Sequence, residues 1–233
     1  MKQNESLAET RAVFVLFAQK PNKSEQSPEY GFFCGGFYGR INENSKNAEG
    51  GRSMTNAPKT VLAIHDLPGF GRAALSVIVP VLSTLGVQTV ALPTAVLSTH
   101  TGGLGTPAKL ADPGYGPVAL EHYHRLGVKF DCIYSGYLAD AAQAKLVEQA
   151  FELWPRAFKV VDPVLGDGGR LYSGLGADMV PAMYSLCSKA DLIVPNVTEA
   201  ALLLGDPLPG VGSAEQAAAQ AARLTRVAPQ VVV

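Results

Sequence analysis

The chain has few charged side chains and almost no excess of either sign. Charged residues make up 17% of its 233 residues, and 20 acidic side chains against 19 basic ones give a net charge of −1. An average globular domain has about 25% charged residues, so this composition argues against a highly solvated, disordered chain. The balance of charge also removes the electrostatic case for binding nucleic acid or an anionic membrane surface.

Cysteine and long apolar runs are scarce as well. The three cysteines, Cys34, Cys132 and Cys187, are widely spaced and form no CxxC pair. This pattern favours reduced thiols in a cytoplasmic protein over a disulfide framework or a zinc site. No apolar run reaches the ~18 residues of a membrane span. The short run at 12–18 follows acidic residues, which is unlike a signal peptide.

The composition changes near Met54. Residues 1–53 scatter Asn, Ser, Lys and Glu and have too little apolar surface to fold alone. Gly50 and Gly51 lie a few codons before Met54. Glycine codons begin with GG, so this pair is what a purine-rich ribosome-binding site would give if it were translated. We therefore expect residues 1–53 to be an untranslated leader read as protein, with a disordered extension or a docking arm as alternatives. We expect residues 54–233 to form the folded domain.

After Met54, short apolar runs alternate with amphipathic segments. Strands are predicted at 61–65, 87–92, 130–134, 158–161, 191–194 and 229–233, and helices at 72–85, 118–126, 139–154, 179–187 and 214–223. A long loop is predicted over 98–117. The alternation indicates an α/β fold with a mainly parallel, doubly wound sheet and helices on both faces. Because the sequence stops inside an apolar strand, we expect this fold to be incomplete at its C-terminus.

Polar clusters follow five of the predicted strands. They are Asp66, the run 98–101, the run 135–137, the run 162–167 and the run 195–199. Ligands of open α/β sheets bind beyond the carboxyl ends of the strands, so we expect these clusters to converge on one rim. Capping of the next helix is the alternative for Asp66. His65 is interpreted as a packed strand-end histidine rather than a base, and the glycine-rich run 101–105 as a lid rather than a P-loop.

Three carboxylates within these clusters point to phosphate chemistry. Asp162, Asp167 and Glu199 would repel one another unless a cation or hydrogen-bond donors lie among them. Mg²⁺ takes one or two carboxylates, several waters and substrate phosphates, which is the arrangement of a phosphoryl-transfer site. Surface caps and turns are the alternative. Asn196 is expected to brace the turn before its helix.

The same segments carry a family resemblance. Residues 162–167 read DPVLGD, 135–138 read SGYL, 196–199 read NVTE and 92–101 read LPTAVLSTHT. From Thr60 to Val233 the chain resembles the ribokinase-like superfamily, specifically the pyridoxal and pyridoxamine kinases of vitamin B6 salvage. The resemblance covers nearly everything after Met54 and nothing before it.

The resemblance implies ATP-dependent phosphorylation of the 5′-hydroxymethyl group of pyridoxal, pyridoxamine or pyridoxine, in a protein that is a homodimer at full length. By this resemblance the vitamer pocket is lined by Asp66, Thr101 and Tyr137. The residues implied around the ATP phosphates are Asp162, Asp167, Glu199 and Asn196. Mg²⁺ would lie beside Asp162 and Glu199, and it would contact Glu199 through a water molecule.

One departure from the family pattern concerns catalysis. The family carries its base in a later Gly-Thr/Ala-Gly-Asp motif, and these 233 residues contain no such motif. We therefore assign no catalytic base and expect this chain alone to be nearly inactive. Hydroxymethylpyrimidine (phosphate) kinase of thiamine synthesis is a second interpretation, although its usual glycine-rich first loop does not match residues 65–71. A non-catalytic vitamer-binding fragment is a third.

Overall fold

The computed structural model describes residues 58–102, 104–172, 174–208 and 212–233. The leader predicted over residues 1–53 lies outside these ranges, and so does Cys34. Cys132 and Cys187 are buried free thiols, as the sequence predicts. Within these ranges, no helix combines the length and the apolar character that a membrane crossing requires.

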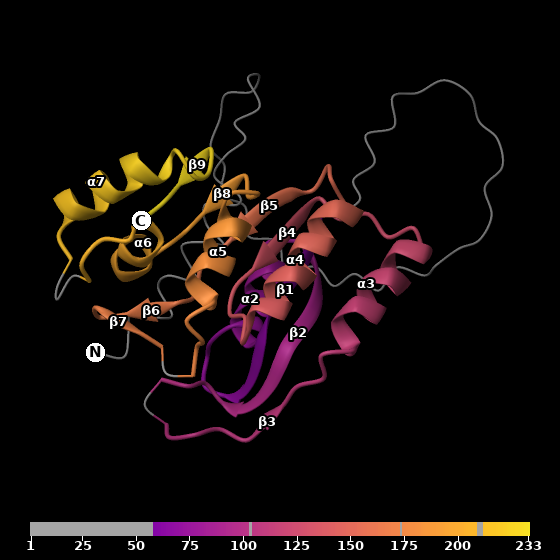
Figure 1. The fold of residues 1–233 in the computed structure, drawn as a ribbon. Coiled ribbons are helices and arrows are strands. Elements are labelled where there is room, and N and C mark those ends of the chain that lie inside the picture. The colour runs from indigo at the N-terminus through magenta and orange to yellow at the C-terminus, as the bar shows by residue number, and fades with distance from the viewer. Residues whose placement is uncertain (1–57, 103, 173, 209–211) are drawn as a thin grey trace, which may run out of the picture.

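A seven-stranded sheet in the order β3-β2-β1-β4-β5-β8-β9 forms the centre of the structure (Figure 1). Its strands are β1 (Thr60–Phe70), β2 (Gln88–Thr99), β3 (Lys109–Leu110), β4 (Cys132–Ser135), β5 (Phe158–Val161), β8 (Leu192–Ile193) and β9 (Gln230–Val231). Only the pairing of β3 with β2 is antiparallel. A separate hairpin pairs β6 (Gly166–Asp167) with β7 (Arg170–Leu171). The predicted α/β fold with a mainly parallel sheet is therefore confirmed.

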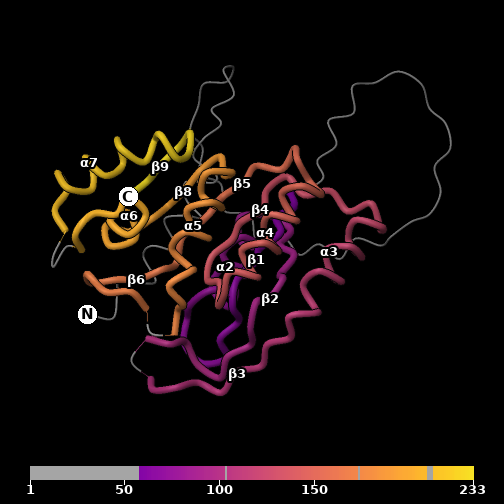
Figure 2. The backbone as a smooth tube through the Cα atoms, in the orientation of Figure 1, coloured from indigo at the N-terminus to yellow at the C-terminus, as the bar shows by residue number. Residues whose placement is uncertain are grey.

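Helices cover both faces of this sheet because the central strands are apolar on both sides. The helices are α2 (Leu75–Thr84), α3 (Tyr115–Arg125), α4 (Ala141–Leu153), α5 (Met179–Cys187), α6 (Val197–Leu204) and α7 (Ala214–Leu224). In β1, Leu62 and Ile64 belong to the core cluster that includes residues of α3 to α7, whereas Val61 and Ala63 pack in the cluster of α2. Helix α3 lies toward the β2 end of the sheet, and α6 and α7 lie toward the β9 end (Figure 2).

Two strands extend much further than the sequence predicts. The segments predicted at 61–65 and 87–92 continue as β1 and β2 to Phe70 and Thr99, since they pair with each other along almost their whole length. The register of this pairing shifts between His65 and Leu67, which marks a bulge beside the polar end of β1. The expectation of a loop over 98–117 is accordingly wrong in part, because this segment also contains β3 and the start of α3.

The remaining boundaries lie close to the predicted ones. The strand at 158–161 and the helix at 179–187 are reproduced residue for residue. Helix α2 begins at Leu75 rather than at 72, because Ala74 has φ 54° and cannot belong to a right-handed helix. Gly86, with φ 76°, follows the C-terminal end of this helix in the left-handed conformation that suits glycine there.

Candidate active site

The carboxyl ends of four adjacent strands meet along one edge of the sheet. The registers align Ile64 of β1 with Ser135 of β4, Ser135 with Val161 of β5, and Val161 with Ile193 of β8. Polar side chains follow each of these positions within one to three residues, so the topology brings most of the predicted clusters to this edge. This is the location at which open parallel sheets bind ligands.

Asn196 and Glu199 form a capping box at the start of α6. The side-chain oxygen of Asn196 accepts a hydrogen bond of 2.9 Å from the Glu199 N–H, and Glu199 Oε2 accepts one of 2.8 Å from the Asn196 N–H. Asn196 Nδ2 also donates a 2.8 Å hydrogen bond to the Gly166 carbonyl of the β6–β7 hairpin. Asn196 therefore braces the turn before its helix and joins that helix to the DPVLGD segment.

Asp162 and Glu199 are buried carboxyl groups, and the charge of Asp162 disfavours the ionisation of Glu199. Their residues are only 4% and 3% exposed. Burial raises the pKa of Asp162 to about 6, while His65 and the Tyr134 hydroxyl act in the opposite direction. Burial and the charge of Asp162 raise the pKa of Glu199 well above its usual value, although backbone N–H groups including that of Leu165 oppose this effect. Two such groups fit a site that holds a cation or shares a proton.

Asp167 lies apart from this buried pair. It occupies the β6 end of the hairpin, it is exposed, and its Oδ1 accepts a hydrogen bond of 2.7 Å from the Gly168 N–H. In the part of the chain that the structure describes, no three His, Cys, Asp or Glu side chains are grouped as metal ligands. The predicted gathering of three carboxylates is thus reduced to two, because the glycine turn after Asp167 holds its carboxylate at the hairpin tip.

On the other side of the edge, Asp66 lies within β1 beside its bulge, and Tyr137 follows β4. Asp66 is 8% exposed, and its Oδ1 is 2.6 Å from His65 Nδ1. Tyr137 is partly buried, and its pKa is raised by burial and by the negative charges of Asp66 and Asp140. The capping alternative for Asp66 is wrong, since the N-cap position of α2 is Ala74 and carries no side-chain cap.

Thr101 is the one predicted pocket residue that the structure leaves exposed. It stands in a bend just after β2, and no hydrogen bond joins it to Asp66 or Tyr137 in the residues that the structure describes. The neighbouring His100 ring accepts a hydrogen bond of 3.0 Å from the Gly102 N–H. The structure therefore groups Asp66 with Tyr137 and places Thr101 on the segment beside them.

Tyr134 is not among the predicted site residues, and Gly136 enters the sequence analysis only as part of the run 135–137. Tyr134 is 1% exposed, and its hydroxyl donates a hydrogen bond of 3.1 Å to Asp162 Oδ2. A Cβ atom on Gly136 would lie 1.9 Å from His65 Cδ2, so only glycine fits under this ring. A signal for Tyr134 was present, because a phenol in a buried strand needs a hydrogen-bond partner. His65 is buried as expected, but it lies inside β1, which continues to Phe70, and not at the predicted strand end.

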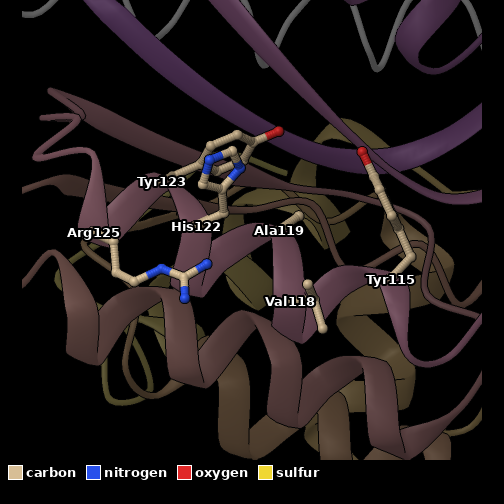
Figure 3. A pocket seen from close by; sticks show the side chains of 6 residues that line it. All are labelled: Tyr115, Val118, Ala119, His122, Tyr123 and Arg125. Atoms are coloured by element: carbon tan, nitrogen blue, oxygen red, sulfur yellow. The ribbon is translucent and has the colours of Figure 1, made fainter.

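A separate shallow cavity of about 310 Å³ lies on α3. It is lined by Tyr115, Val118, Ala119, His122, Tyr123 and Arg125. The side chains of Tyr115, His122 and Tyr123 project from the same side of the helix (Figure 3). Burial and the neighbouring hydroxyl of Tyr115 raise the pKa of Tyr123. None of the residues predicted for the active site lines this cavity.

Known proteins resemble the chain along most of the described region. The family model for phosphomethylpyrimidine kinase matches residues 121–233. A pyridoxal kinase of Deinococcus radiodurans is 28% identical over 189 residues, which are 75% of this chain and 61% of that protein. The crystal structure of pyridoxal kinase from Lactobacillus plantarum aligns with a TM-score of 0.65 and 39% identity, covering 72% of this chain and 60% of that one.

A third relative was solved with a vitamer. This Bacteroides thetaiotaomicron protein, assigned as a phosphomethylpyrimidine kinase and crystallised with pyridoxal, aligns with a TM-score of 0.70 and 39% identity. The alignment covers 75% of this chain and 62% of that protein. The chain thus spans about three fifths of the length of these relatives.

The fold and these similarities define the class to which the protein belongs. Its fold is the α/β fold of the ribokinase-like kinases. Among these kinases the chain is related to the pyridoxal kinases, which confirms the resemblance carried by its motifs.

Proposed function

We propose that this protein is an ATP-dependent kinase that phosphorylates the 5′-hydroxymethyl group of pyridoxal, pyridoxamine or pyridoxine. The observation that carries the proposal is the arrangement at the sheet edge. Asp66 of β1 is near enough to Tyr137, which follows β4, for its charge to raise the pKa of that tyrosine, while the buried carboxyls Asp162 and Glu199 follow β5 and β8. MgATP is the co-substrate, and the full-length protein acts as a homodimer.

In this proposal one side of the sheet edge binds the vitamer and the other side binds the ATP phosphates. The Asp66 carboxylate accepts a hydrogen bond from a polar group of the vitamer, the partly buried Tyr137 ring packs against the vitamer, and Thr101 approaches from the segment after β2. Asp167 and Asn196 lie nearer the phosphates. Positioning and charge neutralisation supply most of the catalysis of phosphoryl transfer, so an ordered edge of this kind suits the reaction.

The residues present fit a magnesium ion. Burial raises the pKa of both carboxyl groups, and the charge of Asp162 raises the pKa of Glu199 further, so a divalent cation would relieve the excess of negative charge. Both Glu199 oxygens already accept backbone N–H groups, so Asp162 is the better direct ligand and Glu199 suits a contact through water. When bound, Mg²⁺ neutralises charge on the transferred phosphoryl group.

We further propose that these 233 residues bind the vitamer but turn it over poorly by themselves. They contain no Gly-Thr/Ala-Gly-Asp motif, in which related kinases place the base and the N–H donors for the transferred group. A general base and oriented N–H donors each commonly contribute ~10²-fold or more in rate. Normal turnover by the 233-residue chain would overturn this part of the proposal and leave the binding part intact.

Calorimetry of pyridoxal binding tests the proposed site. We expect saturable binding by the wild-type chain and weakened binding by Asp66→Asn. Asp178→Asn is the matched control, because Asp178 is exposed at the start of α5 and makes no side-chain cap. We also expect millimolar Mg²⁺ to raise the melting temperature of the wild type but not that of Asp162→Asn. Absence of pyridoxal binding by the wild type would refute the assignment.

The pyrimidine alternative is less well supported than the B6 reaction. Curated and solved relatives are pyridoxal kinases, and the relative assigned as a phosphomethylpyrimidine kinase was solved with pyridoxal. Phosphorylation of pyridoxamine and of hydroxymethylpyrimidine should be compared side by side in a complete enzyme. Pyridoxal binding without nucleotide binding would favour a non-catalytic vitamer-binding protein instead.

A further inference from the structure

The carboxylate of Asp66 is held by its neighbour in the chain. His65 and Asp66 stand at the bulge of β1, where the register with β2 shifts after His65. This bulge allows consecutive side chains, which would point to opposite faces in a regular strand, to meet. His65 Nδ1 lies 2.6 Å from Asp66 Oδ1, and the two side chains are 3% and 11% exposed. A contact this short with a carboxylate oxygen requires a proton between the two atoms.

The surroundings of the other ring nitrogen favour one tautomer of His65. The Tyr137 N–H lies 3.4 Å from Nε2, so this nitrogen accepts a long hydrogen bond when it carries no proton. The proton of a neutral ring then sits on Nδ1 and is donated to Asp66. The Asp66 N–H also approaches Nδ1, at 2.9 Å. The carboxylate contact determines the tautomer, because Nδ1 and the carboxylate oxygen, 2.6 Å apart, would repel each other without a proton between them.

The His65 ring has little freedom to turn. It is 2% exposed and stacks on Tyr134 with ring centroids 6.2 Å apart and an interplanar angle of 23°. On another side it lies so close to Gly136 that a Cβ atom there would be 2.1 Å from Nε2. A ring fixed by β1, β4 and the turn after β4 presents Nδ1 in one direction only.

We infer that His65 is a positioning residue of the vitamer pocket. Its Nδ1–H fixes one oxygen of Asp66, leaving the other for a donor group of the ligand, and its Nε2 anchors the backbone of Tyr137. One ring thereby sets the positions of two pocket residues, one within β1 and the other after β4. The inference rests on the proposed function and extends it to a residue that does not itself touch the vitamer. Preorganisation of this kind lowers the entropic cost of binding.

The test compares His65 variants by calorimetry with pyridoxal. His65→Asn keeps an N–H donor close to the Nδ1 position, whereas His65→Gln moves its amide toward the Nε2 position and His65→Ala removes both. We expect His65→Asn to bind within about threefold of the wild type, and His65→Gln and His65→Ala to bind about tenfold or more weakly. In an Asp66→Asn background, His65→Gln should cause little further loss, because the group that it positions has changed.

Equal affinity of His65→Gln and the wild type would overturn the inference. The inference is also overturned if His65→Gln weakens pyridoxal binding as much in the Asp66→Asn background as in the wild type, because that result indicates a general structural effect. Should His65→Ala fail to fold, the comparison of the Asn and Gln variants carries the test. Imidazole ¹⁵N spectra give a readout that needs no vitamer: we expect the Nδ1–H tautomer in the wild type and its loss in Asp66→Asn. An Nε2–H tautomer would refute the positioning role even if pyridoxal binds.

Discussion

The Tyr134 hydroxyl donates a 3.1 Å hydrogen bond to Asp162 Oδ2, and the ring of the same tyrosine stacks on His65. Tyr134 lies at the centre of the sheet, on the strand between those that carry the two partners. His65 in turn contacts Asp66. A single buried tyrosine thus connects the vitamer side of the proposed site with its phosphate side.

Removal of this hydroxyl should destabilise the protein in a pH-dependent way. The hydrogen bond from Tyr134 lowers the pKa of Asp162, so it favours the ionised carboxylate. We expect Tyr134→Phe to lose roughly 1–3 kcal/mol of unfolding free energy at pH 8, where Asp162 is ionised, and less at pH 5. Urea unfolding at the two pH values measures this difference. Tyr184→Phe, at an exposed position of α5, is the control. Equal losses at both pH values would contradict the prediction.

The raised pKa of Asp162 predicts how stability changes with pH when no metal is bound. Its folded-state pKa of about 6 exceeds the ordinary value of 3.8 for an aspartate, so the folded protein binds this proton more tightly than the unfolded chain does. The contribution of protonated Asp162 to the free energy of unfolding is complete below pH ~4 and is lost as the pH rises through about 6. Two pKa units correspond to a change on the order of 3 kcal/mol. Glu199 acts in the same direction.

Asp162→Asn should remove most of this decline between pH 4.5 and 7.5 in urea unfolding without Mg²⁺. Asp131 is a suitable control, because its pKa is lowered in the folded protein whereas that of Asp162 is raised. Although burial acts to raise its pKa, hydrogen bonds from Lys59 and from the Thr60 N–H lower it overall. Asp131→Asn should therefore leave the decline between pH 4.5 and 7.5 in place. An unchanged decline in Asp162→Asn would show that the buried pair does not cause it.

The sequence was sufficient for the fold because apolar periodicity and turn residues act locally. Short apolar strands such as 158–161 alternate with amphipathic helices such as 179–187, and this alternation predicted a parallel sheet with helices on both faces. The lengths of β1 and β2 were underestimated, since polar residues such as Asp66 and Ser98 end an apolar run although pairing between the strands continues past them. Strand β3 could not be predicted, because its two exposed residues carry no periodic signal.

The site was predictable in its residue types but less so in its contacts. The predicted strand ends pointed to Asp66, Asp162 and Glu199, and the strands that carry or precede these residues are neighbours in the sheet. The separation of Asp167 from this pair depends on the turn of a two-residue hairpin, which a linear pattern does not reveal. The contact of His65 with Asp66 depends on a bulge and on close packing against a glycine, and both are tertiary features.

Asn196 supplies two bonds whose contributions can be separated. Asn196→Ala loses both the cap of α6 and the hydrogen bond to Gly166, and should cost about 1–3 kcal/mol of unfolding free energy. Asn196→Ser keeps a hydroxyl that can cap the helix but loses the donor to Gly166, and should cost less. Chemical denaturation of the two variants measures the difference. A larger loss in the serine variant would contradict the assignment of the cap.

Gly136→Ala should disturb the vitamer side of the site more than its single added carbon suggests. The new Cβ would lie 1.9 Å from His65 Cδ2 and 2.1 Å from Nε2, so the ring or the backbone after β4 must move. The ring cannot turn freely, because it stacks on Tyr134 and its Nδ1 contacts Asp66. We expect a loss of about 1–3 kcal/mol in unfolding free energy, as for overpacking in a core, together with weaker pyridoxal binding.

The control for this variant is Gly114→Ala before α3. Gly114 has φ −78°, and a Cβ atom there meets only Asp112 Oδ1, at 3.2 Å, on an exposed side chain that can move aside. It should change stability by less than ~1 kcal/mol and leave pyridoxal binding unaltered. The comparison isolates the contact with His65 from the general effect of replacing a glycine. Wild-type stability and affinity in Gly136→Ala would mean that the His65 ring has a second position available, and a ring with that freedom could not fix the Asp66 carboxylate.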